Sequence, residues 1–295
     1  MFPRKEIKAN ARAALKANYW PVVGWPFLLE LILNAVVITV IVAILIGSLG
    51  AIAFSSLSGL RAALDSSIST LILLEVVLIV ICLFLNVIAA GQCYFFYKFY
   101  SGDKASFGTF FEGCKDGRFW HVFGGMALMT LYVVLWTWLF VLPGAILMGV
   151  SVNFYLNIGL MVATFVIGLV LYIIGIIFAF VKAYQYSMIP FLLIDKDELT
   201  VKECFKATKA MTAGNKFNLF VLDLSFIGWG ILAMITCGLL SIFFVNPYMN
   251  LAVAGAYDYL KRTRLADPEV VEESAAEESV NTEAKTLTDD SMFEE

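Results

Sequence analysis

Residues 71–97 read LILLEVVLIVICLFLNVIAAGQCYFFY, and Glu75 is the one charged side chain in this run. An α-helix rises 1.5 Å per residue, so about 20 apolar residues cross a hydrocarbon core of about 30 Å. A core helix of a soluble protein would interrupt such a run with a polar face. The stretch therefore predicts a transmembrane helix.

Similar runs recur along the chain, and the composition agrees with them. Hydrophobic residues make up 61% of the 295 residues and charged residues 15%, whereas soluble domains contain about 45–50% and about 25%. We predict an all-α, polytopic membrane protein whose membrane domain covers residues 1–266. The six expected transmembrane helices cover about residues 21–50, 71–97, 119–142, 158–181, 219–236 and 239–260.

Helix-breaking residues set several of these boundaries. Pro143-Gly144 is expected to end the third span, and Cys237-Gly238 to separate the fifth span from the sixth. Pro247 interrupts the sixth span. An extension of the fourth span past Lys182 toward Pro190 is left open.

The positive charges gather in alternate loops. Eighteen Lys and Arg residues lie in the N-terminal segment and in the stretches after the second, fourth and sixth spans, whereas Arg61 is alone in the opposite loops. Loops rich in Lys and Arg stay in the cytoplasm. The pattern predicts an even number of spans with both termini cytoplasmic.

The C-terminal segment has the opposite charge. Residues 267–295 contain eleven acidic residues and one basic residue, a net charge of −10, whereas residues 1–266 contain nineteen basic and thirteen acidic residues, a net charge of +6. The segment has few apolar residues, so it cannot bury enough apolar surface to stabilise a fold. We predict a disordered acidic cytoplasmic tail that competes electrostatically with anionic lipids for the basic part of the protein.

A short amphipathic segment precedes the first, third and fifth spans, which indicates three repeats of an interfacial helix and a helical hairpin. Thr200 and Glu203 have the spacing of a capping box at the start of the third segment. The apolar faces consist of Ile7, Ala11, Ala14 and Leu15, of Phe107, Phe110, Phe111 and Cys114, and of Val201, Cys204, Phe205 and Thr208.

The repeats also share cationic faces and aromatic junctions. Arg4, Lys8, Arg12 and Lys16 form a stripe at spacing four on the first segment. Because aromatic and basic side chains mark the membrane interface, we expect the interfacial anchors to include Trp20, Trp120, Phe217, Lys202, Lys206 and Lys209.

Ionisable residues inside spans are costly and therefore candidates for function. Glu30 lies well inside the first span with Asn34 one turn further on, and Asp223 lies in the fifth. Each carboxylate either serves a function or pairs with a polar group of another helix, and Asn86 and Gln92 are possible partners.

The fifth span also contains Ser225, Gly228 and Gly230, which predict a close helix contact. Trp229 between the glycines either fills that contact or lines a lipid-facing groove. The binding candidates are thus Glu30, Asn34, Asp223 and Trp229.

The sequence gives no support for catalysis or for a bound cofactor. Its five cysteines and single His121 are scattered rather than clustered as in metal sites, and it contains no nucleophile or phosphate-loop motif. We expect no enzyme activity, metal or cofactor, and no nucleic-acid partner, because no soluble basic domain is present.

Several short motifs resemble those of one family. The runs Tyr184-Gln-Tyr-Ser187, Ser225-Phe-Ile-Gly-Trp229 and Pro247-Tyr248, with Asn18-Tyr-Trp20 near the start, are similar to the bacterial membrane-protein family called domain of unknown function 975. The resemblance covers nearly all of residues 4–260. It implies a multi-pass protein of the bacterial cell membrane and no established activity.

Three functions remain open from the sequence. The leading hypothesis is a non-enzymatic protein that binds anionic lipids of the bilayer, or another membrane protein, through its basic cytoplasmic helices. The alternative is a transporter or channel for a small solute that uses Glu30 and Asp223, because broken helices resemble those of transporters. An intramembrane enzyme is the third.

Overall fold

The computed structural model describes residues 2–53, 60–115, 117–154, 157–196 and 198–265. The acidic segment 267–295 lies outside these residues. All regular structure in the described part is helical. In chain order the helices are α1 (Arg4–Ala17), α2 (Tyr19–Ala53), α3 (Leu60–Tyr100), η2 (Phe107–Cys114), α4 (Phe119–Ser151), η3 (Val152–Phe154), α5 (Ile158–Tyr186), α6 (Ile189–Asp195), α7 (Val201–Thr212), α8 (Lys216–Leu224), α9 (Ile227–Ile235), η4 (Ser241–Val245), α10 (Asn246–Leu260) and η5 (Lys261–Leu265).

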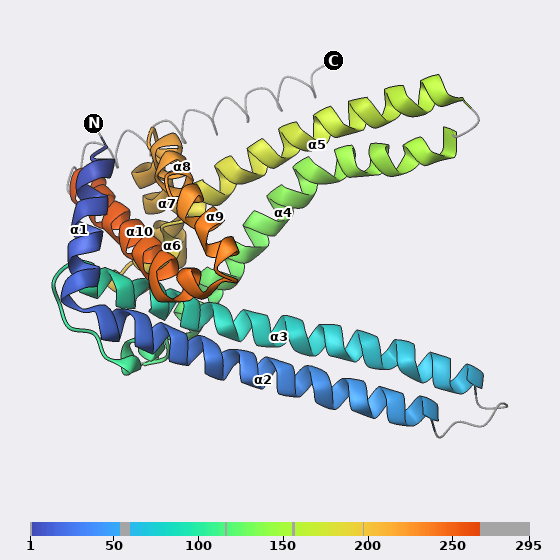
Figure 1. Ribbon diagram of the computed structural model, residues 1–295, viewed down its shortest axis with the longest axis horizontal. Coiled ribbons are helices and arrows are strands. Elements are labelled where there is room, and N and C mark those ends of the chain that lie inside the picture. The colour runs from blue at the N-terminus through green and yellow to red at the C-terminus, as the bar shows by residue number, and fades with distance from the viewer. Residues whose placement is uncertain (1, 54–59, 116, 155–156, 197, 266–295) are drawn as a thin grey trace, which may run out of the picture.

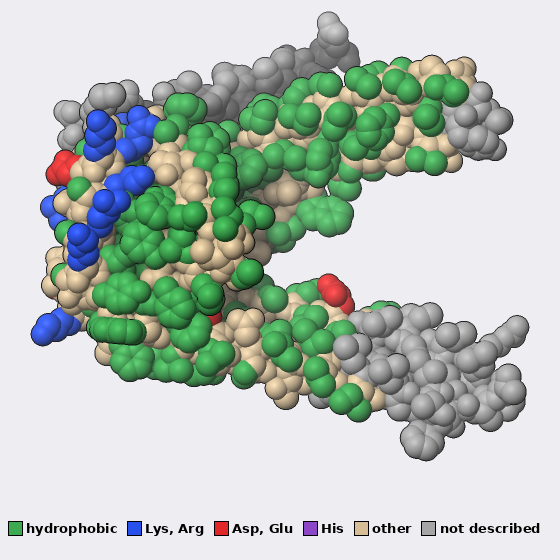
Figure 2. Space-filling model, viewed as in Figure 1, with side chains coloured by type: hydrophobic (Ala, Val, Ile, Leu, Met, Phe, Trp, Pro, Cys, Tyr) green, Lys and Arg blue, Asp and Glu red, His purple; other side chains and the backbone are tan. Residues whose placement is uncertain are grey.

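Two long hairpins, α2–α3 and α4–α5, project from a compact body in which α1 and α6 to α10 are gathered (Figure 1). Figure 2 shows apolar side chains over these hairpins and the Lys and Arg side chains of the visible face at the far end of the body. Five helical stretches of the described part are long and apolar enough to cross a membrane, which indicates a membrane protein. They are Tyr19–Val42, Ile72–Tyr100, Phe119–Ser151, Ile158–Asp195 and Lys216–Ile235.

The sixth predicted span, residues 239–260, is not among these five. The stretch divides into a π-helical turn, η4, and the 15-residue helix α10, which has Pro247 in its first turn. Tyr248, Leu251 and Tyr257 of α10 are each at most 1% exposed. The sequence is apolar here because α10 is the central helix of the body, where protein surrounds it.

One predicted helix end is wrong. Pro143 does not end the third span, because α4 continues through it to Ser151. Proline lacks an N–H, but a Cβ on the next residue, Gly144, would collide with the backbone of Tyr172. This close packing against α5 holds the segment helical.

One other boundary prediction is confirmed, and a boundary that was left open is resolved. Cys237 and Gly238 end α9 with positive φ angles of 51° and 83°, a conformation that favours glycine. The extension of the fourth span is also found, since α5 continues past Lys182 to Tyr186 and α6 follows it.

The close helix contact occurs in a different hairpin from the predicted one. A Cβ on Gly228 or Gly230 would meet no atom within 4 Å, so the prediction for the fifth span is wrong. Gly168 and Gly175 of α5 instead lie directly against the backbone of α4. Ser225 lies at a break in the fifth span, between α8 and α9, where its hydroxyl donates to the Leu222 carbonyl at 2.5 Å.

The three amphipathic segments correspond to α1, η2 and α7, which precede α2, α4 and α8 in the chain. The sequence predicted that these segments lie at the membrane interface, and the structure places parts of their apolar faces against the protein itself. Ala11, Phe110 and Cys204 are fully buried, because each face packs on the protein body. The second segment is a 3₁₀ helix rather than an α-helix, and Phe110 stacks on Phe95 at 4.5 Å between ring centroids.

The third amphipathic helix begins as predicted. The backbone N–H of Thr200 donates to the Glu203 carboxylate at 2.7 Å, and the N–H of Glu203 donates back to the Thr200 hydroxyl at 3.4 Å. This reciprocal pair is a capping box. The hydrogen bonds from Thr200 lower the pKa of Glu203.

A largely buried ion pair and its hydrogen bonds join α3, α6, α10 and η5. Lys261 Nζ lies 2.6 Å from Asp195 Oδ2, and their side chains are 24% and 11% exposed. The Tyr257 hydroxyl donates to the same oxygen at 2.6 Å, and Lys261 donates to the Tyr97 hydroxyl at 3.2 Å. Burial opposes the charge of Lys261, but the hydrogen bonds to Asp195 and Tyr97 outweigh it and raise its pKa.

Candidate functional site

Helix α1 separates its apolar and cationic residues onto different faces. Ile7, Ala11 and Leu15 are at most 2% exposed, and their spacing of four matches one face of a helix with 3.6 residues per turn. Because these residues pack on the body, Lys5 and Arg12 remain at the surface. The sequence pattern thus produces a cationic outer face.

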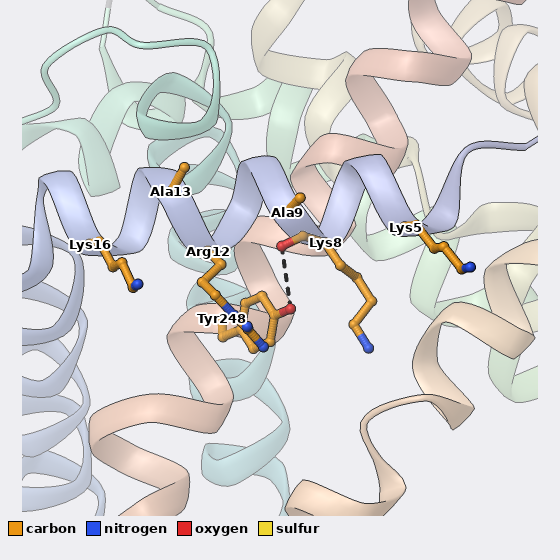
Figure 3. Close-up of a pocket in the computed structure, with 7 residues that line it drawn as sticks. All are labelled: Lys5, Lys8, Ala9, Arg12, Ala13, Lys16 and Tyr248. Carbon is orange, nitrogen blue, oxygen red and sulfur yellow. Dashed lines mark hydrogen bonds between the residues drawn. The ribbon is translucent and has the colours of Figure 1, made fainter.

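This cationic face lines an open cavity of about 500 Å³ (Figure 3). Four of the lining residues are cations and none is acidic, and Tyr248 of α10 closes one side. The residues that line the cavity are Lys5, Lys8, Ala9, Arg12, Ala13, Lys16 and Tyr248.

Neighbouring helices hold two of the cations in place. Lys8 Nζ donates to the Ser225 hydroxyl at 3.0 Å and lies 4.7 Å from the ring centroid of Phe226. The Arg12 guanidinium lies 5.6 Å from the ring centroid of Tyr248, whose hydroxyl donates to the Lys8 carbonyl at 3.3 Å. The break between α8 and α9 and the start of α10 therefore orient the cationic face.

The electrostatics of the cavity favour an anion. Partial burial and the charge of Arg12 lower the pKa of Lys8. In the part of the chain that the structure describes, no ion pair joins Lys5, Lys8, Arg12 or Lys16 to an acidic side chain. A phosphate or carboxylate in the cavity would relieve this repulsion, because Arg and Lys bind both groups with charge-assisted hydrogen bonds.

An apolar cavity follows the cationic one along the chain. It has a volume of about 480 Å³ and lies on the first turns of α2. The cationic face ends at Lys16, and Trp20 begins the apolar cavity. The lining residues are Trp20, Pro21, Gly24, Trp25, Phe27 and Leu28.

The aromatic residues predicted as anchors are alike in exposure. Trp20, Trp120 and Phe217 are 77%, 74% and 73% exposed. Each belongs to the first turns of a helix that is long and apolar enough to span a membrane. Such exposure of a large aromatic ring is typical of a membrane interface. On α7, the side chains of Lys202, Lys206 and Lys209 are exposed as well.

Glu30 and Asn34 do not form a pair through their side chains. Asn34 donates to the backbone carbonyl of Glu30 at 2.8 Å. Glu30 lines a cavity of about 20 Å³ together with Gln92, one of its predicted partners, and with Asn246 and Asn250 of α10. This volume holds about one water molecule.

Asp223 and Trp229 have separate surroundings. The Tyr184 hydroxyl donates to Asp223 Oδ2 at 2.7 Å, which joins α5 to α8. Trp229 packs on Phe244 with ring centroids 5.1 Å apart. Asp223 is absent from the residues that line the cavity of Glu30, so the structure does not bring these two carboxylates together.

Sequence reasoning found the cationic stripe of α1 but missed Lys5 and Tyr248, which also line the cavity, and Ser225, which accepts a hydrogen bond from Lys8. Lys5 lies outside the spacing-four stripe, and Tyr248 and Ser225 come from more than 200 residues away. The Pro247-Tyr248 motif was a signal, although nothing in the sequence indicates that Tyr248 faces α1. Within the described residues, no group of three or more His, Cys, Asp or Glu side chains is placed to hold a metal ion.

The fold and the site define a helical protein with helices of membrane-spanning length and a basic surface at one end. The chain belongs to the family described as Protein of unknown function (DUF975), whose model matches residues 1–264. The match confirms the resemblance noted in the sequence. No curated protein and no solved structure matches the chain.

Proposed function

We propose that the protein is a non-enzymatic, multi-pass protein of the bacterial cell membrane that binds anionic lipid headgroups at its cytoplasmic face. The observation that carries this proposal is the cationic cavity of α1, which four basic side chains line without an acidic one. Each basic residue near an anionic lipid surface contributes about 1 kcal/mol of attraction. The apolar cavity that starts at Trp20 provides a surface for the acyl chains of the same lipid.

The position of the chain ends supports the proposed topology. Phe2 packs edge-on against Tyr259, with ring centroids 5.2 Å apart, so the start of α1 lies beside the end of α10. Ends on the same side of a membrane require an even number of crossings. The Lys and Arg residues of the loops favour a cytoplasmic position for that side.

The proposed six crossings form three repeats, each with a short helix and a hairpin. In the third repeat, α8 and α9 form the outward arm and η4 and α10 form the return arm. The turn between these arms is apolar and exposed, with Met234, Ile235 and Leu239 at 81%, 73% and 61%. Protein surrounds much of the return arm. The arm is divided into η4 and the 15-residue α10, so it does not form one long helix.

Lipid binding is tested on purified, delipidated protein in an uncharged detergent. Native mass spectrometry gives the Kd for phosphatidylglycerol, with phosphatidylcholine as the neutral comparison. Replacing Arg12 and Lys16 by Gln removes two cations from the cavity, so we expect the Kd for phosphatidylglycerol to rise about 30-fold. The Kd for phosphatidylcholine should stay constant.

The matched control replaces Lys104 and Lys196 by Gln, because both are exposed lysines outside the cavity. This control should change the Kd for phosphatidylglycerol by less than about threefold, since neither lysine lines the cavity that would hold the headgroup. An equal loss in both double variants contradicts a specific headgroup site. An unchanged Kd in the Arg12 and Lys16 variant contradicts the cavity as that site.

The topology has an independent test. Cysteines introduced near Lys104 and Lys206 should react with a membrane-impermeant reagent only from the cytoplasmic side. A cysteine near Arg61 should react only from outside. Labelling of either basic loop from outside contradicts the six-span arrangement.

A further inference from the structure

One helix, α10, connects the cationic cavity to the end of the described chain. Helix α10 packs along α1, and Tyr248 near the start of α10 closes that cavity. The contact between Phe2 and Tyr259 places the other end of α10 beside the first turn of α1. Helix α10 therefore joins the cationic helix α1 to the last described residues, 261–265 (Figure 1).

Charge and length fit the acidic segment 267–295 to this cavity. The segment carries eleven acidic residues and one basic residue. Lys5 and Lys16 are separated by about 16 Å of helix. The acidic pairs Glu272-Glu273 and Glu277-Glu278 are five residues apart, which allows a separation of up to about 17 Å. A flexible chain of this length has a reach of about 30 Å, enough to follow all of α1.

We propose that the acidic segment 267–295 of the same chain occupies the α1 cavity and is displaced from it by anionic lipid. The carboxylates of the segment take the place of lipid phosphates against the same four cations. The regulatory part of this inference rests on the proposed lipid function, whereas the docking of the segment does not.

Other surfaces of the body suit an acidic occupant less well. The opposite side of α1 has a cavity of about 310 Å³ that includes Glu6 and Asp258, which repel it. On α7, the exposed Glu203 lies between Lys202 and Lys206 in the sequence. The α1 cavity combines four cations with an acid-free lining, so we assign the segment to it.

Photo-crosslinking of the full chain in uncharged, lipid-free detergent tests the docking. The crosslinker p-benzoylphenylalanine replaces Ala13, which lines the cationic cavity, or Asn10, which lines the acidic one on the same helix. Peptide mapping should find adducts with residues 267–295 at least about tenfold more often from Ala13, because one hydrogen bond to a charged group is worth about that ratio. The crosslinker at a third position, in place of Lys206, tests whether the segment contacts α7 instead.

Salt and charge variants make the test specific. Adducts from Ala13 should disappear at about 1 M NaCl, where the Debye length is about 3 Å. They should also disappear when Glu272, Glu273, Glu277 and Glu278 are replaced by Gln. Equal adducts from Ala13 and Asn10, a preference for Lys206, or adducts that persist in high salt would each overturn the docking.

Lipid titration then separates this inference from the proposed function. A chain that ends after Leu265 should bind phosphatidylglycerol about fivefold more tightly at low salt, equivalent to one basic residue that regains its lipid contact. The difference should shrink as salt rises. Equal affinity of the two chains overturns the competition. If neither chain binds phosphatidylglycerol while the Ala13 adducts form, the lipid function fails and the docking stands.

Discussion

The α4–α5 hairpin and the body around α10 are both apolar, but their helices are held together differently. In the hairpin, Gly144 and Gly168 let the two backbones touch. In the body, aromatic rings and the ion pair between Asp195 and Lys261 join the helices. Figure 1 shows the difference in shape, since the hairpin projects alone and the body gathers many short helices.

This difference follows from the surroundings of each region. Lipid tails are as apolar as leucine, so helices in lipid associate through close packing rather than through the hydrophobic effect. The body buries polar groups inside protein, where each must find a partner. Substitutions that remove a partner should therefore harm the body most, and substitutions that add bulk should harm the hairpin most.

The largest expected effect is in the body. Lys261→Met leaves Asp195 largely buried without its cation, which should lower the free energy of unfolding by about 3 kcal/mol. Arg262→Met is the matched control, because Arg262 pairs with Asp258 at 3.0 Å but its side chain is 73% exposed. The control should lose less than about 1 kcal/mol. Unfolding in detergent measures both, and equal losses contradict a buried role for Lys261.

A somewhat smaller effect is expected in the hairpin. Gly144→Leu forces α4 away from the backbone of Tyr172, and such overpacking costs about 2 to 3 kcal/mol. Gly149→Leu on the same helix should have little effect, because a Cβ there meets no atom within 4 Å. Size-exclusion profiles and thermal midpoints report the outcome. A Gly149→Leu protein as unstable as Gly144→Leu would show that the glycines are not a packing surface.

The smallest effect concerns the junction between the two regions. Tyr184→Phe removes the hydroxyl that donates to Asp223, so α5 loses its hydrogen bond to α8. A hydrogen bond to a charged group is worth about 1.5 kcal/mol or more. Tyr172→Phe on the same helix is the control, because no hydrogen bond of its hydroxyl is found in the described residues. If both variants unfold alike, the contact between Tyr184 and Asp223 does not stabilise the junction.

Much of the fold was predictable because helix length and hydrophobicity are local properties. The runs at α2 to α5 predict helices that the structure contains, and Thr200 with Glu203 predicts the start of α7. The predictions that were wrong concern contacts between one helix and another. Pro143 breaks an isolated helix, yet packing against α5 overrides it, and Gly228 offers a contact surface that no helix uses.

The candidate site was predictable only in part. The cationic stripe of α1 follows from spacing alone, and Trp20 is found exposed. The alternatives for Glu30 and Asp223 depended on which groups face them. Glu30 meets asparagines of α10 at a small cavity, and Asp223 meets Tyr184. No local pattern specifies such partners.

By itself, the sequence determined the helical class, the family, and the separation of cationic and apolar faces on α1, because each depends on residue type and spacing within one segment. The tertiary structure decided that α10 is the central helix of the body, that Tyr248 lines the cavity of α1, and that Ser225 holds Lys8 in place. Burial depends on what packs against a helix. An apolar run such as residues 239–260 is equally stable against lipid and against other protein helices, so only the tertiary structure shows which of the two surrounds it.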